Sequence, residues 1–305
     1  MRVERYDGSA LSPVGAVTVG TFDGVHRGHQ VVIESVIAKS STINGESAIV
    51  TFDPHPREVV TGEGVALLTT VEERADAMGA MGVDRLIVLP FTSEMADWSA
   101  EKFAREVLAG TLSARVVVVG HDHGFGRKRS GDVGLLERIG SEMGFRVHQV
   151  GAHLEGDLVV SSTKIRTAIE EGRVADAAVM LGRPYRMIQR VTQGDQRGRT
   201  IGFPTANLVP PSGKVLPMFG VYAADVRIGD SPTVYRAAVN VGVRPTFGEN
   251  APLVEVHLID FEGDLYGQRL SVDFVRRVRA ERRFDGLDAL KTQLHDDVAR
   301  CRASE

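Results

Sequence analysis

Near its N-terminus the chain carries a stretch rich in glycine and histidine, which reads VGTFDGVHRGHQ from Val19 to Gln30. Gly20 lets the backbone approach a ligand closely, because glycine has no side chain. His26 and His29 stand three residues apart, and at a helix start this spacing can bring both imidazoles to one phosphate. Gly28 removes a side chain between them. The stretch therefore predicts a phosphate site, and its alternative is a turn with two surface histidines.

A second stretch that suits phosphate lies at residues 161–166 and reads SSTKIR. Either of its first two serines can cap a helix that Gly172 ends, which places hydroxyls and the Arg166 guanidinium at an anion-favouring helix start. Alone, this stretch would be read as an ordinary capped helix. Together with the two histidines it predicts the second wall of one site.

A third stretch, at residues 194–207, reads GDQRGRTIGFPTAN. Its glycines and arginines can form a loop that closes over phosphates, and the oxygens of Thr205 and Asn207 are hard ligands suited to Mg²⁺. The chain contains no GxxxxGK[ST] sequence, so a Walker-type NTPase is not indicated. The alternative for this stretch is a glycine-rich barrel loop with a stiff proline turn.

The elements that must hold the first two stretches show an alternating rhythm. Nearly continuous apolar runs, which indicate strands buried on both faces, occur at residues 16–22, 47–52, 85–91 and 114–120. Helical patterns lie between them at 30–40, 71–81 and 99–108, the last with Ser99 as N-cap. The rhythm predicts a doubly wound α/β fold, in which ligands bind beyond the carboxyl ends of the strands.

From about Pro184 onward, strand-like stretches follow one another directly. They occur at residues 185–192, 221–228, 234–241, 253–260 and 269–278. Within one of them Val254 and Val256 alternate with Glu255, which is the period of a half-buried antiparallel strand. The second half is therefore expected to be a small β-barrel or sandwich, closed by a helix from about Gly286 that Asp285 caps. The predicted domains are residues 1–182 and 183–305.

Charge and cysteine content limit the function classes. Residues 1–182 have 18 Lys and Arg against 25 Asp and Glu, while residues 183–305 have 18 against 15, so the two parts carry −7 and +3. Neither balance suits a protein that neutralises many phosphates of a duplex, and no nucleic-acid partner is expected. The single cysteine, Cys301, excludes an intrachain disulfide and fits a reducing cytoplasm. Neither a signal peptide nor a membrane span is indicated, so we expect a cytoplasmic protein.

The first stretch resembles the adenylyl-transfer signature of the bacterial bifunctional riboflavin kinase/FAD synthetase family, within the HxGH nucleotidyltransferases. Residues 51–56 (TFDPHP), 120–126 (GHDHGFG) and 161–166 resemble further segments of that family, and residues 194–207 resemble its kinase signature GRxxGxPTAN. The resemblance covers nearly the whole chain. It implies a Rossmann-like nucleotidyltransferase domain, followed by a six-stranded antiparallel β-barrel kinase domain with a C-terminal helix.

The resemblance implies two reactions, each with Mg²⁺. The second domain would phosphorylate riboflavin with ATP to FMN, and the first would transfer AMP from ATP to FMN, releasing pyrophosphate and forming FAD. The partners are then the small molecules ATP, riboflavin and FMN, and homo-oligomerisation stays open. Two alternatives remain, a protein in which only the kinase is active and a flavin carrier or flavin-sensing regulator.

At the adenylyl-transfer site the resemblance implies ten residues around the ATP phosphates: Gly20, Phe22, Asp23, His26, Gly28, His29, Ser161, Ser162, Thr163 and Arg166. On the flavin side it implies His55, Asp122, Phe125 and Arg127. The segment 122–129 is equally read as a mobile basic loop. A zinc site of His55, His121, Asp122 and His123 is a rival, because these are good ligand types.

At the kinase site the resemblance implies ATP contacts from Gly194, Arg197, Gly198, Gly202, Pro204, Thr205 and Asn207, the last two holding Mg²⁺. It implies Glu255 as the base that accepts the proton of the riboflavin 5′-hydroxyl. Glu255 is otherwise only the solvent-facing member of an alternating strand. Residues 240–247 resemble a segment that lines the same pocket, and Arg283 with Phe284 would close over the flavin.

Overall fold

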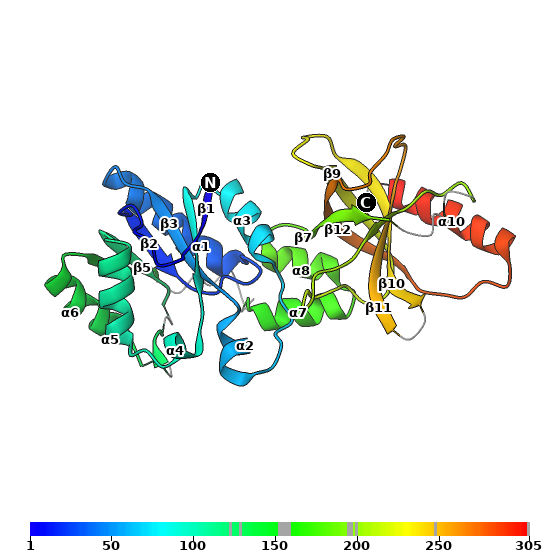
Figure 1. Cartoon of the computed structure of the whole chain (residues 1–305). Helices are drawn as coiled ribbons and strands as arrows, with labels where there is room; N and C mark the ends of the chain where they lie inside the picture. Colours follow the sequence, from blue (N-terminus) through cyan, green and yellow to red (C-terminus); the bar gives the residue numbers. More distant parts are fainter. Residues whose placement is uncertain are drawn as a thin grey trace. The chain divides into compact units, whose positions relative to one another are not determined.

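The computed structural model describes residues 1–121, 124–127, 130–151, 160–193, 198, 201–246 and 249–303. It divides into two compact units (Figure 1). Unit 1 contains Met1–Val65 and Arg74–Val160, and unit 2 contains Ala66–Glu73 and Ser161–Glu305. Residues 161–182 thus group with unit 2, and the domain boundary after residue 182 stays a prediction.

Unit 1 is built on a six-stranded sheet in which every neighbouring pair is parallel. Its order is β1 (Arg2–Arg5), β4 (Arg85–Pro90), β3 (Ser47–Asp53), β2 (Ala16–Val19), β5 (Val116–Val119) and β6 (Arg146–Gln149). Val17, Val50, Ile87 and Val117, from the four inner strands, are almost fully buried in one core. The predicted α/β class is confirmed.

The helices of unit 1, one of them a π-helix, lie between these strands. They are α1 (Arg27–Thr42), α2 (Pro56–Thr61), α3 (Val71–Ala80), α4 (Ser93–Ala96), α5 (Ala100–Phe103), the π-helix Ala104–Thr111 and α6 (Val133–Met143). The predicted cap at Ser99 is confirmed, because its side chain accepts a hydrogen bond from the Lys102 amide at 3.0 Å. The single helix expected over residues 99–108 is instead a short α-helix continued by the π-helix.

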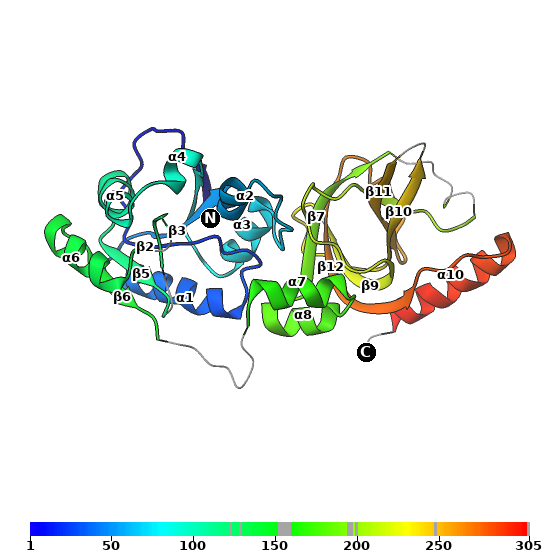
Figure 2. The same ribbon diagram turned by 90° about the horizontal axis from the view of Figure 1, so that it is seen from below.

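The described part of unit 2 contains a pair of helices, the strands of a closed barrel and a C-terminal helix. The helices α7 (Ser162–Glu170) and α8 (Val174–Leu181) precede the strands, and α10 (Leu287–Arg302) follows them. The strands are β7 (Tyr185–Thr192), β8 (Ala206–Leu208), β9 (Gly220–Ile228), β10 (Tyr235–Thr246), β11 (Glu249–Leu258) and β12 (Arg269–Ala280). They close in the antiparallel order β10-β11-β8-β7-β12-β9, and Figure 2 looks into this ring. The implied six-stranded barrel is confirmed.

The expected cap of the last helix is wrong. Gly286, not Asp285, holds the N-cap position of α10, and no side chain caps the first turn. The extended backbone at Gly286 delays the helix by one residue, so the Asp285 carboxylate stands one position too early to act as the N-cap.

None of the helices in the described part of the chain combines the length and the apolar character that a bilayer span requires.

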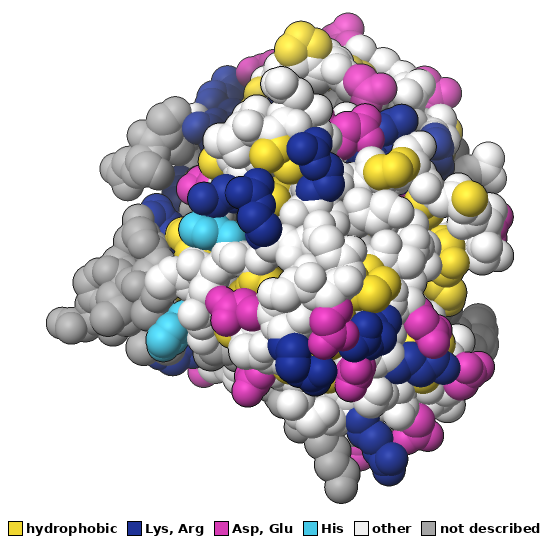
Figure 3. Space-filling model, turned by 90° about the vertical axis from the view of Figure 1, so that its left-hand side faces the viewer, with side chains coloured by type: hydrophobic (Ala, Val, Ile, Leu, Met, Phe, Trp, Pro, Cys, Tyr) yellow, Lys and Arg dark blue, Asp and Glu magenta, His cyan; other side chains and the backbone are white. Residues whose placement is uncertain are grey.

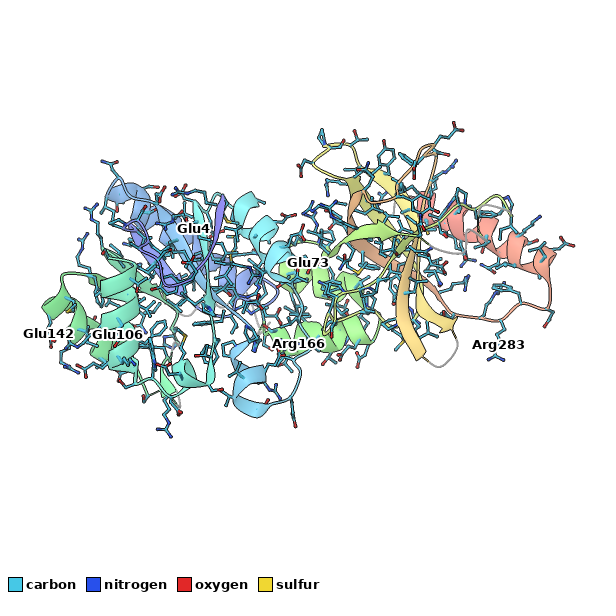
Figure 4. The ribbon with its side chains drawn as sticks, viewed as in Figure 1. Glu4, Glu73, Glu106, Glu142, Arg166 and Arg283 are labelled. Atoms are coloured by element: carbon cyan, nitrogen blue, oxygen red, sulfur yellow. The ribbon has the colours of Figure 1, made fainter. Side chains whose placement is uncertain are left out.

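A buried ion pair holds the segment Ala66–Glu73 within unit 2. Lys214 Nζ lies 2.6 Å from Glu73 Oε2 and also donates to the carbonyls of Leu68 and Arg186, at 2.7 and 3.0 Å. The other carboxylate oxygen of Glu73, labelled in Figure 4, accepts from the Ile188 amide at 2.9 Å. Both side chains are almost fully buried, so each charge depends on the other.

Lys214→Met is expected to destabilise unit 2 strongly. The substitution fits the space of the lysine stem but leaves the Glu73 carboxylate buried without its cation, which typically costs about 3–5 kcal/mol. Urea unfolding measures the loss. Arg300→Met is the matched control, because its ion pair with Asp296 is exposed and such pairs contribute at most about 1 kcal/mol. If both variants lost the same small free energy of unfolding, the buried ion pair would contribute no more to stability than the exposed one.

Candidate active sites

The loop that joins β2 to α1 is tightly wound. Phe22, Gly24 and Val25 all have positive φ, at 48°, 87° and 42°. This conformation is unusual for phenylalanine and rarer still for a β-branched residue. Among the contacts that hold it, the Val25 amide donates to the Phe22 carbonyl and the Gln30 side chain donates to the Val25 carbonyl, both at 2.9 Å. Strain of this kind is typical of functional loops that the surrounding structure over-determines.

His26 and His29 lie together at the start of α1. Their rings stack, with centroids 3.6 Å apart and planes inclined by 15°. His26 is the N-cap, and its Nδ1 accepts a hydrogen bond from the His29 amide at 3.3 Å. A neutral imidazole has one donor nitrogen, so this bond leaves Nε2–H of His26 as the donor. A Cβ on Gly28 would stand 3.3 Å from the His26 ring, which explains the glycine between the two histidines.

The other predicted residues of this loop pack around the histidines. Phe22 meets His29 edge to face at 5.1 Å between centroids, and a Cβ on Gly20 would stand 3.1 Å from the Phe22 ring. Asp23 is only 2% exposed. The structure therefore brings Gly20, Phe22, Asp23, Gly28 and both histidines into one compact loop.

Sequence reasoning missed Arg74. Its Nη1 donates to the Thr21 carbonyl at 2.9 Å and to the Thr51 hydroxyl at 2.5 Å, and the residue is 4% exposed. Arg74 thus joins the loop that follows β2 to strand β3. No sequence signal marks this role, because Arg74 stands within an ordinary helical pattern.

The described residues among those implied for the flavin side make contacts within unit 1. His55 caps α2 by accepting from the Arg57 amide at 3.1 Å. Phe125 packs against the core of unit 1, with its ring 6.3 Å from that of Phe103. The Arg127 guanidinium lies 3.4 Å from the Asp97 carboxylate. Asp122 lies outside the described residues.

Two of the four residues in the zinc alternative, Asp122 and His123, lie outside the described residues. Among the residues that are described, no group of three or more His, Cys, Asp or Glu is arranged to hold a metal ion.

The SSTKIR stretch begins α7 as the sequence predicts. Ser161 is the N-cap and accepts from the Lys164 amide at 3.3 Å, while Gly172, with φ at 76°, lies just beyond the helix end. Arg166, labelled in Figure 4, donates from Nε to the Ala66 carbonyl at 2.6 Å. Ser162 and Thr163 form the first turn. This stretch belongs to unit 2 and the histidines to unit 1, so a shared site stays a prediction.

In the barrel, three polar side chains stand in one row across neighbouring strands. The register pairs Glu255 of β11 with Asn207 of β8 on one side and with Asn240 of β10 on the other. Val254 and Val256 are buried, at 0% and 1% exposure, so the row lies on the outer face of the barrel. The Asn240 Nδ2 donates to Glu255 Oε2 at 3.3 Å. The Asn207 Oδ1 is buried, and within the described structure it has no hydrogen-bond partner.

The turn before β8 is anchored to the same strand as Glu255. His257, two residues further along β11, donates from Nδ1 to the Pro204 carbonyl at 2.8 Å. At Gly198 a Cβ would stand 2.3 Å from the Phe203 carbonyl oxygen, so only glycine fits. Gly202 has φ at 89°, and Thr205 is exposed. Gly194 and Arg197 lie outside the described residues.

The sequence patterns gave no role to His257, although its spacing of two from Glu255 already places it on the same face.

Arg283 and Phe284 lie on the connection between β12 and α10, where Figure 4 labels the exposed Arg283. The guanidinium groups of Arg279 and Arg282 lie 5.8 and 4.8 Å from the Phe284 ring centroid.

On the face in Figure 3, acidic side chains are interspersed with basic ones over the described residues.

Comparison with known proteins places both halves of the chain in families. Residues 10–164 match the family model of FAD synthetase, and residues 181–304 match that of riboflavin kinase. A bifunctional riboflavin kinase/FMN adenylyltransferase of Pseudomonas fluorescens is 38% identical over 94% of this chain and 91% of its own length. The corresponding proteins of Escherichia coli K12 and Bacillus subtilis 168 are 37% and 34% identical, each over 92% of this chain and over 90% and 89% of their own lengths.

A solved structure from Streptococcus pneumoniae has the same architecture. It is named a macrolide-efflux protein, is 30% identical to this chain and superposes with a TM-score of 0.85 over 99% of both chains.

Proposed function

Because the chain belongs to the family of bifunctional riboflavin kinase/FMN adenylyltransferases, we propose that it phosphorylates riboflavin to FMN and then adenylylates FMN to FAD. The observation that carries this proposal is that each matched half holds a matching set of chemical groups. The FAD synthetase half has stacked histidines at a helix start, and the kinase half has a carboxylate beside an amide oxygen. The efflux name of the streptococcal structure has no counterpart in these groups.

In the kinase reaction Glu255 acts as the general base. It accepts the proton of the riboflavin 5′-hydroxyl while that oxygen attacks the γ-phosphorus of ATP, and the bond from γ-phosphorus to the bridging oxygen of ADP breaks. The outer-face position of Glu255 leaves its carboxylate accessible to substrate. Gly198, Gly202 and Pro204 shape the turn that approaches the ATP phosphates.

The residues present fit a magnesium ion. Mg²⁺ prefers oxygen ligands, and the buried Oδ1 of Asn207 is an oxygen that no described group satisfies. We assign Asn207 and the exposed Thr205 hydroxyl as its protein ligands. When bound, Mg²⁺ would neutralise phosphate charge.

In the adenylyl transfer a phosphate oxygen of FMN attacks the α-phosphorus of ATP and pyrophosphate leaves. This step needs no covalent intermediate, so positioning and charge stabilisation suffice. The Nε2–H of His26 and the imidazole of His29 donate to phosphate oxygens as charge develops there. Ser161, Ser162, Thr163 and Arg166 are proposed to bind the same triphosphate. His55, Phe125 and Arg127 are proposed to lie on the flavin side of this site.

One incubation tests the proposal against its two alternatives. The protein is mixed with riboflavin and ATP·Mg²⁺, and FMN and FAD are separated by chromatography. We expect both products, and neither when EDTA removes the metal ion. Formation of FMN alone, with no FAD from added FMN, would identify a protein in which only the kinase is active. Bound riboflavin without either product would identify a carrier or regulator.

A further inference from the structure

Asn240 is the third member of the polar row on the barrel. It begins the segment 240–247 that resembles a pocket-lining segment of the family, but the proposed chemistry gives it no role in the reaction. It lies directly opposite Glu255 in the antiparallel pair of β10 and β11. Side chains at such positions share one face, with Cβ atoms about 4.5–5.5 Å apart. Val239 and Val241, its neighbours along β10, are fully buried. The alternation of the strand therefore aims Asn240 at the same outer surface as Glu255.

The contact between the two residues is specific in direction. The amide Nδ2 of Asn240 donates to one carboxylate oxygen, Oε2, at 3.3 Å. Oε1 of Glu255 remains on the side of the carboxylate that this amide does not occupy. A glutamate side chain has several rotatable bonds, and a donor that engages one oxygen restricts the directions in which the other can point.

The chemistry of an amide suits this place. A lysine or arginine would form an ion pair with Glu255 and make the carboxylate a weaker base. A second carboxylate would repel it. The Asn240 amide already has one acidic neighbour, because a Cβ on Gly242 would stand 2.3 Å from Glu281 Oε1 and 3.5 Å from Asn240 Nδ2. A neutral donor orients the glutamate without either penalty.

We infer that Asn240 is a positioning residue for the kinase reaction, which holds the Glu255 carboxylate in the orientation that accepts the hydroxyl proton. This inference rests on the proposed function, since it assumes that Glu255 is the base. The side chain of Asn240 contacts Glu255, so its proposed role acts through that carboxylate. Its loss should therefore lower kcat for FMN formation while leaving the KM values for riboflavin and ATP nearly unchanged.

The test uses Asn240→Asp, which keeps the shape but replaces the donor with a negative acceptor, and Asn240→Leu, which removes the donor without adding charge. In the full-length protein we expect kcat for FMN formation to fall about tenfold in Asn240→Asp and less in Asn240→Leu, because the base remains in place and loses only its orientation, whereas loss of the base itself costs about 10²–10⁴-fold. The rate of FAD formation from FMN, measured on the same samples, should not change. Gln189→Glu makes the same amide-to-carboxylate change on β7 and should retain both activities.

A double substitution separates positioning from a merely structural role. If Asn240 acts through Glu255, Asn240→Asp should cause no further loss in a chain that already carries Glu255→Gln. The inference is overturned if Asn240→Asp keeps kcat within about twofold, raises KM instead, or adds its full effect in the Glu255→Gln background. Failure of the proposed function looks different, because then the unsubstituted protein makes no FMN or Glu255→Gln alone keeps full activity.

Discussion

Glu255→Gln should reduce FMN formation by about 10²–10⁴-fold, the usual contribution of a general base. The substitution keeps the size of the side chain and its place beside Asn207 and Asn240, but an amide cannot accept the hydroxyl proton. Steady-state assays with riboflavin and ATP measure the fall in kcat. FMN-to-FAD conversion on the same protein should proceed at the unsubstituted rate.

Asp225→Asn is the matched control for this change. It also converts a carboxylate to an amide on a barrel strand, but Asp225 forms a partly exposed ion pair with Arg236 on β9 and β10. Both reactions should survive it. If Glu255→Gln lowered FMN formation no more than Asp225→Asn does, another group would have to serve as the base.

His29→Ala should reduce FAD formation from FMN by about 10²–10³-fold, which is the typical effect of removing one preorganised donor from a charge-stabilising site. The variant also removes the ring that stacks on His26 at 3.6 Å, so the remaining imidazole loses a support. FMN formation from riboflavin should be unaffected. Product analysis by chromatography, started separately from riboflavin and from FMN, distinguishes the two reactions.

His148→Ala provides the control for this variant. His148 lies on the edge strand β6, where burial, and secondarily the charge of Lys39, lowers its pKa. Lys39 stands in the last turn of α1, whereas His26 and His29 stand at its start. We expect His148→Ala to leave both reactions intact. Equal losses of both reactions in His29→Ala, with the fold preserved, would refute the assignment of two separate sites.

The fold was predictable where a strand has a continuous apolar sequence and sufficient length. The inner strands β2, β3, β4 and β5 are buried on both faces and appear in the sequence as continuous apolar runs. The edge strands β1 and β6 were not predicted, because they have four residues each and read RVER and RVHQ. Strand β8 has only three residues and is held by pairing with β7 and β11, which a local pattern does not show.

The candidate sites were predictable to the extent that their residues lie close in the sequence. His26, Gly28 and His29 belong to one turn, and their spacing already indicates that the rings meet. Arg74 contacts Thr21 from 53 residues away, and Asn240 contacts Glu255 from the neighbouring strand. Such contacts depend on the register of a sheet or the docking of a helix, so they become visible only in the assembled fold.

The alternation along β11 has a consequence for how this enzyme can change over generations. Val254 and Val256 contribute to the barrel interior, while Glu255 and His257 face outward and carry little of the folding free energy. Mutations at the outer positions can therefore alter the reaction with little risk of unfolding the protein, whereas mutations at the inner positions are removed by selection before any new activity is tried. Alternate positions of one strand are thus under different selection, the inner ones for stability and the outer ones for activity.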